Sequence, residues 1–375
     1  MRKTNLAMAF SDEQAMILDS AKAFCSDKST IAAVRNLLDS ETGFNPQVWQ
    51  EMVALGWTGI AIPEEYGGLN LGVGALVPLV ETMGRHLLGT PLISSALTAQ
   101  AILRSGTESQ RAAWLPALAD GAAGALALLD NEDWGGDFSG CTVGGSGENL
   151  TLTGRKLMVA DGAVADLFVV SASHAGQPVL VLVEAKQLPA GALKSKTLID
   201  ETKRACNVDF SGVTVTSSAL LTPSASTLHE LRLIGALLTA AEATGTAAAA
   251  LDLIVSYLTT RVQFGRLIGS YQALKHPTVE ILLQMDAARS LIYHAATLIG
   301  DGPIDSVTEI ACRMAKAQAT EALLFAGDRA VQFHGGMGFT YDCDAQLYIR
   351  RAQWAQHQYG DAQHHRRKLA DLLLD

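Results

Sequence analysis

A long, nearly uncharged stretch in the C-terminal half places the strongest constraint on how this chain folds. Between Leu233 and Leu251 the only charged residue is Glu242, and the run has about the length of a membrane-spanning helix. The run is mostly Ala, Gly and Thr, Arg232 and Asp252 bound it, and no aromatic belt follows. We therefore expect a helix buried on most sides in a helical bundle, and no membrane span.

Hydrophobic periodicity divides the chain into three regions. Up to about residue 121 apolar residues recur at helical spacing, with helix-start signals at Ser11, Asn45 and Thr107. Short apolar runs then alternate with Gly, Asn and Asp, as strands alternate with turns. Long helical patterns return near residue 224. We predict an α-helical N-terminal domain at 1–121, a β domain at 122–223 and a helical C-terminal domain at 224–375, rather than alternating α/β units.

Composition excludes several classes of protein. The 375 residues are 49% hydrophobic and 18% charged, so a large core in two or three domains is expected. A net charge of −10 disfavours nucleic-acid binding and an electrostatic role at membrane surfaces. The five cysteines are scattered without a CxxC pair, and the N-terminus has no signal-peptide pattern, which predicts a cytoplasmic protein without a zinc site. The GxGxxG and Walker motifs are also absent.

Two polar, glycine-containing stretches in the last third carry the most specific information. They are RVQFGRLIGSYQALKH at 261–276 and AVQFHGGMGFTYD at 330–342. Arg261 can pair with a phosphate, and the glycines of the second stretch let the backbone approach a ligand closely. The alternative is that these glycines end a helix and that Arg261 is solvated.

Together these stretches resemble the acyl-CoA dehydrogenase family. Its pattern is RxxFG, a Gln about seven residues later, and QxxGGxG late in the chain. GWTGIAIPEEYGGLNLG also resembles the family's first-domain loop, and GRKLMVADGAVADLFVVSA resembles its middle-domain strands. The likeness covers nearly the whole chain. The residues that match the motifs are Arg261, Phe264, Gly265, Gln272, Gln332, Gly335, Gly336 and Gly338.

This resemblance implies an α+β multidomain fold with an α-helical N-terminal domain, a β-barrel middle domain and a C-terminal four-helix bundle. It also implies FAD in a tetramer built as a dimer of dimers. In the family the flavin rests on the middle domain of one chain, and a neighbouring chain holds the ADP half. The residues expected to bind FAD, on the neighbour's side, are Arg261, Phe264, Gln272, Gln332, Gly335 and Gly336.

The family's catalytic base is missing from both of its known positions. The reaction removes a proton from the α carbon of an acyl-CoA thioester, which requires a carboxylate held close and largely desolvated. The usual Glu, in a YEG-like motif, aligns with Tyr359 or Gly360. The position that some members use on an earlier helix falls on Gly235, counting back from Arg261. A phenol, with a reference pKa of about 10, is a poor base at pH 7.

Three nearby carboxylates are the substitutes to consider. Asp361 follows Tyr359 by two residues, Glu242 lies about two turns after Gly235 on the same helix face, and Glu230 lies near the helix start. The catalytic residue is unknown, and Asp361 is the candidate that we retain. For each carboxylate the alternative is a cap, a buried hydrogen bond or a solvated surface. The small residues around Gly235 predict room for a bulky acyl group.

The flavin-facing elements also depart from the family pattern. LLDNEDWGGDFSG replaces the family's TE and GSD segment, and Met158 and Ala160 replace a Trp and a Thr. Trp134 either offers a compensating stacking surface or is a packing residue. The HHRRK cluster at 364–368 either meets CoA phosphates or forms a solvated helix face, and its adjacent histidines point to different faces, so no metal site is expected.

The resemblance therefore leads to three hypotheses. The first is a subunit that lacks the base and completes the FAD site of a catalytic paralogue, as in bacterial heterotetramers that act on steroid side chains or rings. The second is a self-sufficient FAD-dependent acyl-CoA dehydrogenase with an unusual base. The third keeps the fold but changes the chemistry, as in a flavin oxidase or a non-catalytic acyl-CoA- or FAD-binding homologue. Expected partners are an acyl-CoA substrate, a homo- or heterotetramer partner chain, and an electron-transfer flavoprotein as acceptor.

Overall fold

The N-terminal region is helical, as its periodicity predicts. The computed structural model describes residues 12–134 and 140–374, so the start signal at Ser11 lies outside the described residues. The Asn45 side chain accepts the N–H of Gln47, and Thr107 with Gln110 forms a capping box, which confirms two predicted starts. The helices are α1 (Asp12–Lys28), α2 (Ile31–Asn36), α3 (Pro46–Ala54), α4 (Leu76–Arg85), α5 (Leu92–Ser105) and α6 (Glu108–Ala119).

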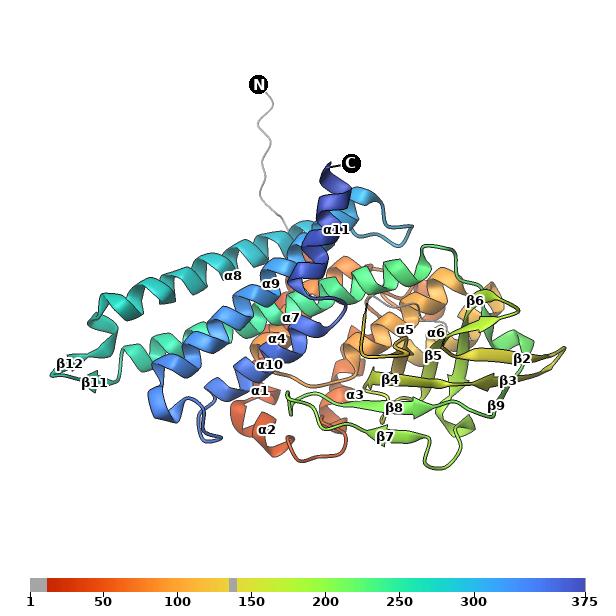
Figure 1. Ribbon diagram of the computed structural model, residues 1–375, viewed down its shortest axis with the longest axis horizontal. Helices are drawn as coiled ribbons and strands as arrows, with labels where there is room; N and C mark the ends of the chain where they lie inside the picture. The colour runs from red at the N-terminus through yellow and green to blue at the C-terminus, as the bar shows by residue number, and fades with distance from the viewer. Residues whose placement is uncertain (1–11, 135–139, 375) are drawn as a thin grey trace, which may run out of the picture.

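The middle region is built of two sheets rather than one closed barrel. One sheet has the order β10-β6-β5-β2-β3-β9, with β1 paired to β5, and the other has the order β4-β8-β7. The fold prediction is confirmed, with the barrel present as a half-barrel (Figure 1). The strands are β1 (Gly124–Ala127), β2 (Thr142–Ser146), β3 (Asn149–Thr153), β4 (Arg155–Ala160), β5 (Leu167–His174), β6 (Gln177–Glu184), β7 (Leu193–Ser195), β8 (Ala205–Asp209), β9 (Val213–Val215) and β10 (Leu220–Leu221).

The C-terminal region is a bundle built around the apolar stretch. Within the described residues, α7 is the one helix long and apolar enough to cross a bilayer, and its apolar window is 100% buried inside the molecule. The prediction of a buried bundle helix is confirmed. The elements are α7 (Thr227–Leu258), β11 (Val262–Gln263), β12 (Arg266–Leu267), α8 (Gln272–Leu298), α9 (Ser306–Phe333), the 3-10 turn η7 (Gly335–Met337), α10 (Ala345–His357) and α11 (Ala362–Leu374).

Two glycines bring the N-terminal and C-terminal helices into backbone contact. A Cβ on Gly84 of α4 would lie 2.1 Å from the carbonyl oxygen of Glu242 on α7. In return, a Cβ on Gly245 of α7 would lie 1.8 Å from the carbonyl oxygen of Glu81 on α4. Only glycine fits at such distances, so the small residues of α7 serve close helix packing.

The structural elements change type near both predicted domain boundaries. The helices of the first region end with α6 before β1 begins at Gly124, and the strands end with β10 before α7 begins at Thr227. These positions support the boundaries at 121/122 and 223/224, which we keep as a proposal.

Candidate functional site

A two-residue hairpin presents the first predicted FAD-binding motif to solvent. Strands β11 and β12 pair Val262 with Leu267, and the turn places Phe264 at φ 52° and Gly265 at φ 77°. Positive φ at both central residues is the geometry of a type I′ turn. Phe264 is unusual at such a position and is 91% exposed, so the turn holds an aromatic ring in water.

The second motif lies at the end of α9 and in η7. Gln332, Gly335 and Gly336 are all exposed, and Gly335 has φ 60°. The ring of His334 stacks on Tyr257 of α7 with centroids 4.1 Å apart, and the Tyr257 carbonyl accepts the backbone N–H of Arg261. This stack, which the sequence did not reveal, joins the two motifs at one end of the bundle.

All six predicted FAD-binding residues therefore gather in one region. Arg261 and Phe264 lie in and beside the hairpin, Gln272 begins α8, and the residues from Gln332 onward lie next to them through the aromatic stack. This region and the sheets of the middle domain lie at opposite ends of the elongated molecule (Figure 1). The hairpin is thus directed away from the chain's own middle domain.

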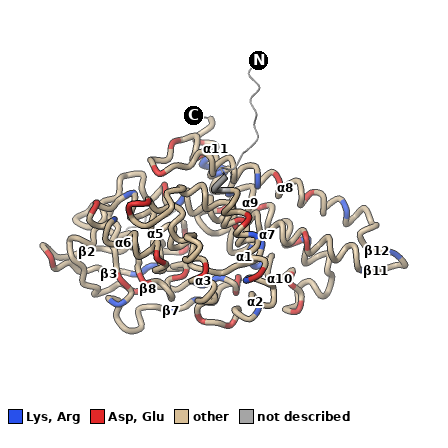
Figure 2. Tube along the Cα trace, turned by 180° about the vertical axis from the view of Figure 1, so that it is seen from behind, with Lys and Arg blue, Asp and Glu red and all other residues tan. Residues whose placement is uncertain are grey.

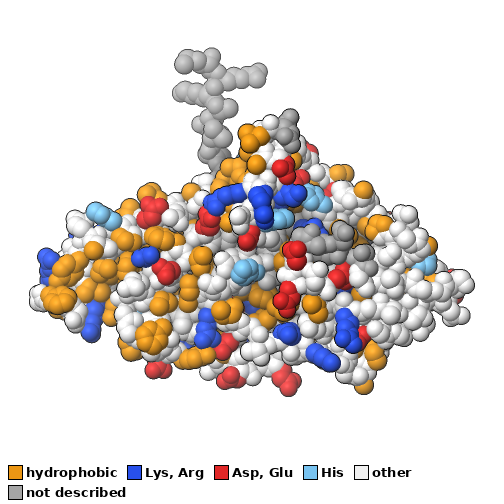
Figure 3. Space-filling view, in the orientation of Figure 1, with side chains coloured by type: hydrophobic (Ala, Val, Ile, Leu, Met, Phe, Trp, Pro, Cys, Tyr) orange, Lys and Arg blue, Asp and Glu red, His pale blue; other side chains and the backbone are white. Residues whose placement is uncertain are grey.

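The hairpin region combines positive charge with exposed apolar surface. Among the described residues, neither Arg261 nor Arg266 has a carboxylate within ion-pair distance, and the hairpin tip is basic (Figure 2). Hydrophobic side chains gather over the same end of the molecule in Figure 3. Guanidinium groups without counter-ions beside an exposed aromatic ring fit the phosphates and the ring of a nucleotide. The exposed apolar residues there are Val262, Phe264, Leu267, Val279, Leu282, Leu283, Met337 and Phe339.

The two positions that align with the family's catalytic base, Gly235 and Tyr359, lie in contact with each other. A Cβ on Gly235 would lie 2.5 Å from Cε1 of Tyr359. The Tyr359 ring also packs against Trp134, with centroids 4.4 Å apart and planes tilted by 39°. The expected room for a bulky acyl group beside Gly235 is therefore wrong, because the tyrosine ring occupies it.

The group that replaces the base is a protonated phenol. Burial, reinforced by the negative charge of Asp161, raises the pKa of Tyr359 far above its ordinary value. The turn that carries Tyr359, at φ 57°, is fixed by the buried Lys316, whose Nζ donates to the carbonyl of Gly360 at 2.8 Å. Burial lowers the pKa of that lysine to about 7, while Asp361 opposes the shift.

Trp134 packs against the residues where the flavin-facing motif departs from the family. Together with Met158 and Leu228 it covers the buried pair Leu128 and Leu129. Since one face of the indole lies against Tyr359, the tryptophan acts as a packing residue at this point.

Each of the three carboxylates considered as a substitute base has a structural partner. Asp361 accepts the N–H of His364 at 2.7 Å and so caps α11. Glu230 pairs with Arg104 at 2.6 Å and accepts the hydroxyl of Ser226. Their exposure differs, because Asp361 lies at the surface whereas Glu230 is buried.

Glu242, the third substitute, belongs to a buried ionic cluster. It lies 2.6 Å from Lys203 and 3.0 Å from Arg351, which in turn contacts Asp200 at 2.5 Å. Burial alone would raise the pKa of Glu242, but the two cations hold the pKa below its ordinary value. This carboxylate therefore ties α7 to the middle domain and to α10.

One further carboxylate was missed in the sequence. Asp161 follows Ala160 directly, has φ 55°, and accepts a hydrogen bond from the hydroxyl of Ser94. Burial raises the pKa of Asp161, with Ser94 and Lys203 opposing the shift. The sequence marks Asp161 only through its position directly after Ala160, the residue that departs from the family pattern.

The HHRRK cluster is divided between buried and solvated positions. His365 is 1% exposed, whereas Arg366 and Lys368 are exposed, and Arg366 pairs with Glu321. Within the described residues, no group of three or more potential ligands is arranged to hold a metal ion.

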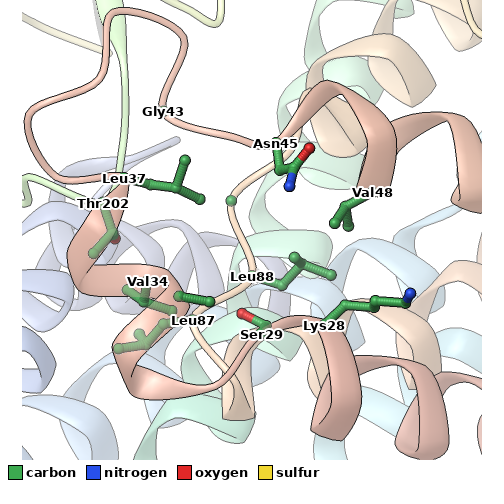
Figure 4. Close-up of a pocket in the computed structure, with 12 residues that line it drawn as sticks. Lys28, Ser29, Val34, Leu37, Gly43, Asn45, Val48, Leu87, Leu88 and Thr202 are labelled. Atoms are coloured by element: carbon green, nitrogen blue, oxygen red, sulfur yellow. The ribbon is translucent and has the colours of Figure 1, made fainter.

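Cavities near these residues differ greatly in size. A cavity of about 470 Å³ is lined by Trp134, Tyr359 and residues of α7, α9 and α11. A second cavity lies between α1, α2 and the loop before α3 and is drawn in Figure 4. It measures about 20 Å³, which is room for about one water molecule, so it holds no substrate.

Comparison with known proteins gives a consistent answer. Family models described as "Acyl-CoA dehydrogenase, N-terminal domain" and "Acyl-CoA dehydrogenase, C-terminal domain" match residues 11–122 and 229–374. Acyl-CoA dehydrogenase IpdE2 of Mycolicibacterium smegmatis is 28% identical over 361 residues, which cover 96% of this chain and 98% of that protein.

Two solved structures are similar over the whole chain. One is a variant of the Tcur3481–Tcur3483 steroid ACAD, with 28% identity, a TM-score of 0.84 and coverage of 97% of this chain and 98% of that chain. The other is the ChsE4–ChsE5 complex from Mycobacterium tuberculosis, with 23% identity, a TM-score of 0.89 and coverage of 99% of both chains. The second likeness concerns the fold alone.

Proposed function

This chain belongs to the acyl-CoA dehydrogenase family, and we propose that it is the subunit without the base in a complex with a catalytic paralogue. Family membership makes it an FAD-dependent oxidoreductase acting on CH–CH bonds, or a subunit of one. The observation that carries the subunit proposal is the contact between Tyr359 and Gly235, with Trp134 packed on the tyrosine. Both base positions lack a carboxylate, and the tyrosine ring at one lies directly against the glycine at the other.

The position of the hairpin supports a role in a neighbour's flavin site. Arg261, Phe264, Gln272, Gln332, Gly335 and Gly336 would hold the ADP half of an FAD whose flavin rests on the paralogue. The guanidinium of Arg261 pairs with phosphate, and the ring of Phe264 covers apolar surface of the nucleotide. The proposal is also supported by the chain's own middle domain, where Trp134 and Met158 pack on Leu128 and Leu129 at the place where the sequence departs from the family's flavin-facing pattern.

The division of labour in the complex follows from these two regions. FAD held by Arg261, Gln332 and the neighbouring glycines would supply hydride-accepting chemistry for the β carbon of the acyl thioester, and the paralogue's glutamate would remove the α proton. This chain holds the nucleotide with its exposed cations and excludes water from the interface with its apolar end. The two-component steroid ACAD among its relatives supports a steroid-derived acyl-CoA as substrate, and we propose an electron-transfer flavoprotein as electron acceptor.

The first test is the ratio of flavin to chain, from the visible spectrum and the protein mass. For the folded chain alone we expect a ratio near zero. Co-expression with a glutamate-bearing paralogue from the same genome should give about one FAD per pair of chains. In that complex Arg261→Ala should weaken FAD binding by about 10- to 100-fold, since a charge-assisted hydrogen bond contributes about 1.5–3 kcal/mol. A ratio near one for the chain alone, with turnover, would overturn the proposal.

The self-sufficient dehydrogenase remains the second candidate because one desolvated carboxylate is available. Asp161 has a raised pKa and acts electrostatically on Tyr359. If the chain alone turns over acyl-CoA, Asp161→Asn should abolish the activity, whereas Asp361→Ala should leave it unchanged because Asp361 caps α11. Loss of activity in Asp361→Ala alone would instead identify Asp361 as the base.

A further inference from the structure

Tyr271, directly before α8, makes three contacts with the exposed hairpin. The guanidinium carbon of Arg266 lies 4.0 Å from the centroid of its ring. The ring of Phe264 meets it edge-on, with centroids 6.5 Å apart and planes at 89°. The phenol hydroxyl also donates to the carbonyl of Gln263 at 3.4 Å. One half-buried side chain thus contacts both sides of the turn and its tip.

The hairpin has little else to hold it in place. Its two strands contain two residues each, and all residues from Arg261 to Leu267 are exposed. An isolated two-stranded hairpin is at best marginally stable in water. Phe264 adds backbone strain through its positive φ, and such strain persists only when neighbouring contacts fix the conformation. Tyr271 supplies those contacts.

Stacking on Tyr271 also prepares Arg266 to bind an anion. A guanidinium that rests on an aromatic face keeps its in-plane N–H donors free. Among the described residues no carboxylate lies within 4.0 Å of Arg266, so those donors have no ionic partner in this chain. The exposed guanidinium of Arg261 lies at the base of the same hairpin. Two cations therefore flank one aromatic tip.

We propose that Tyr271 is a positioning residue that fixes the hairpin for a nucleotide and that Arg266 is a second phosphate-binding cation beside Arg261. This inference rests on the proposed function, because the nucleotide is the ADP half of the FAD that the hairpin would share with a neighbouring chain. It adds two residues that lie outside the family's RxxFG motif. With the hairpin fixed in advance, less conformational entropy is lost when the nucleotide binds.

The experiment uses whichever form retains FAD, the complex with the paralogue or the chain alone. FAD release is followed by the recovery of flavin fluorescence, at two salt concentrations, for Arg261→Ala, Tyr271→Leu, Tyr271→Phe and Arg266→Gln. Tyr341→Leu is the matched control, because Arg350 lies over the Tyr341 ring at 4.7 Å but outside the hairpin. Thermal unfolding of each variant confirms that it is folded.

We expect Tyr271→Leu to weaken FAD binding about five- to tenfold, as the loss of a cation–π contact and of prior ordering implies. Tyr271→Phe, which keeps the ring, should stay within about twofold of the parent, and so should Tyr341→Leu. Arg266→Gln should weaken binding about tenfold and reduce its salt dependence. If Tyr271 only stabilised the fold, Tyr271→Leu would leave the salt dependence of FAD binding, which involves Arg266, unchanged.

The outcomes separate this inference from the proposed function. If Arg261→Ala retains FAD, the proposed function fails and this inference fails with it. If Arg261→Ala releases FAD while Tyr271→Leu and Arg266→Gln bind it normally, only this inference is overturned. Equal weakening by Tyr271→Phe and Tyr271→Leu would assign the effect to the hydroxyl and overturn the role of the ring. Should Tyr271→Leu not fold, the surface variant Arg266→Gln still decides.

Discussion

The hairpin end and the centre around Gly235 differ in how far their polar and aromatic groups are exposed and in whether those groups have partners within the chain. At the hairpin, Arg261 and Phe264 stand in solvent, and among the described residues Arg261 has no ionic partner. At the centre, the half-buried Tyr359 packs against Trp134, and the nearby Glu242 has two cationic partners. Groups left without partners are available to a ligand, whereas groups satisfied within the fold contribute to its stability. Loss of function and loss of stability should therefore separate between the two regions.

The largest stability loss should come from Glu242→Gln. The substitution leaves Lys203 without its carboxylate and removes one of the two carboxylates near Arg351, in a region with almost no solvent. Removal of one partner of a buried pair costs about 3–5 kcal/mol. Urea unfolding measures this cost, with Arg261→Ala as the control that should unfold like the parent. Equal stability of Glu242→Gln and the parent would show that the centre is not held by this cluster.

A loss of about 3 kcal/mol is expected for Tyr359→Ala, because it leaves a cavity between Gly235 and Trp134. Gly235→Ala should cost about 1–3 kcal/mol through overpacking of the same contact. In the double variant the new methyl group no longer meets the ring, so the double variant should lose less stability than the sum of the two single losses. Strict additivity in thermal unfolding would contradict the contact.

A pH-dependent loss of stability is expected from His365. Burial, together with the positive charges of Lys316 and Arg313, lowers the pKa of His365 to about 3. The unfolded imidazole binds a proton near pH 6.5, so stability is lost as the pH falls from about 6.5 towards 3, at up to about 1.4 kcal/mol per pH unit. His365→Gln should flatten this decline, while His357→Gln, at an exposed position, should not. If stability fell equally with decreasing pH in both variants, His365 would not be the cause of the loss.

The smallest effect on stability, and of opposite sign, is expected at the hairpin. Asn is favoured at the first position of a type I′ turn, so Phe264→Asn should relieve strain and raise stability by about 0.5 kcal/mol. The same variant should bind FAD more weakly, because the exposed ring is lost. Thermal unfolding and flavin content are measured on one preparation. Lower stability would mean that Phe264 serves the fold rather than a ligand.

Local patterns were sufficient to predict the elements but not their contacts. The three regions, the buried α7 and the caps at Asn45 and Thr107 follow from spacing within a few residues of sequence. The meeting of Gly235 and Tyr359 joins residues far apart in the chain, so no local signal reveals it. Small residues on a helix are compatible with an open pocket or with close packing, and only the facing element distinguishes the two.

At the candidate site the same limit applies. The RxxFG motif predicts Arg261 and Phe264 as FAD-binding residues because the motif is contiguous in sequence. The stack of His334 on Tyr257 was not predicted, since it depends on how α7 and α9 end beside one another. The capping role of Asp361 was among the alternatives considered, and its hydrogen bond to the His364 N–H is a local interaction of the kind that sequence can predict.

The contact between Gly235 and Tyr359 also fixes an order of mutational steps. A glutamate introduced at position 235 has no room while the tyrosine ring lies 2.5 Å from the position of its Cβ. A lineage that regained a base on α7 would therefore have to replace Tyr359 first and pass through a less stable intermediate. The reverse history is easier, since a chain that has lost its glutamate can fill the space in one step and gain stability. The contact of Tyr359 with Gly235 therefore makes a glutamate at position 235 hard to regain once it has been lost.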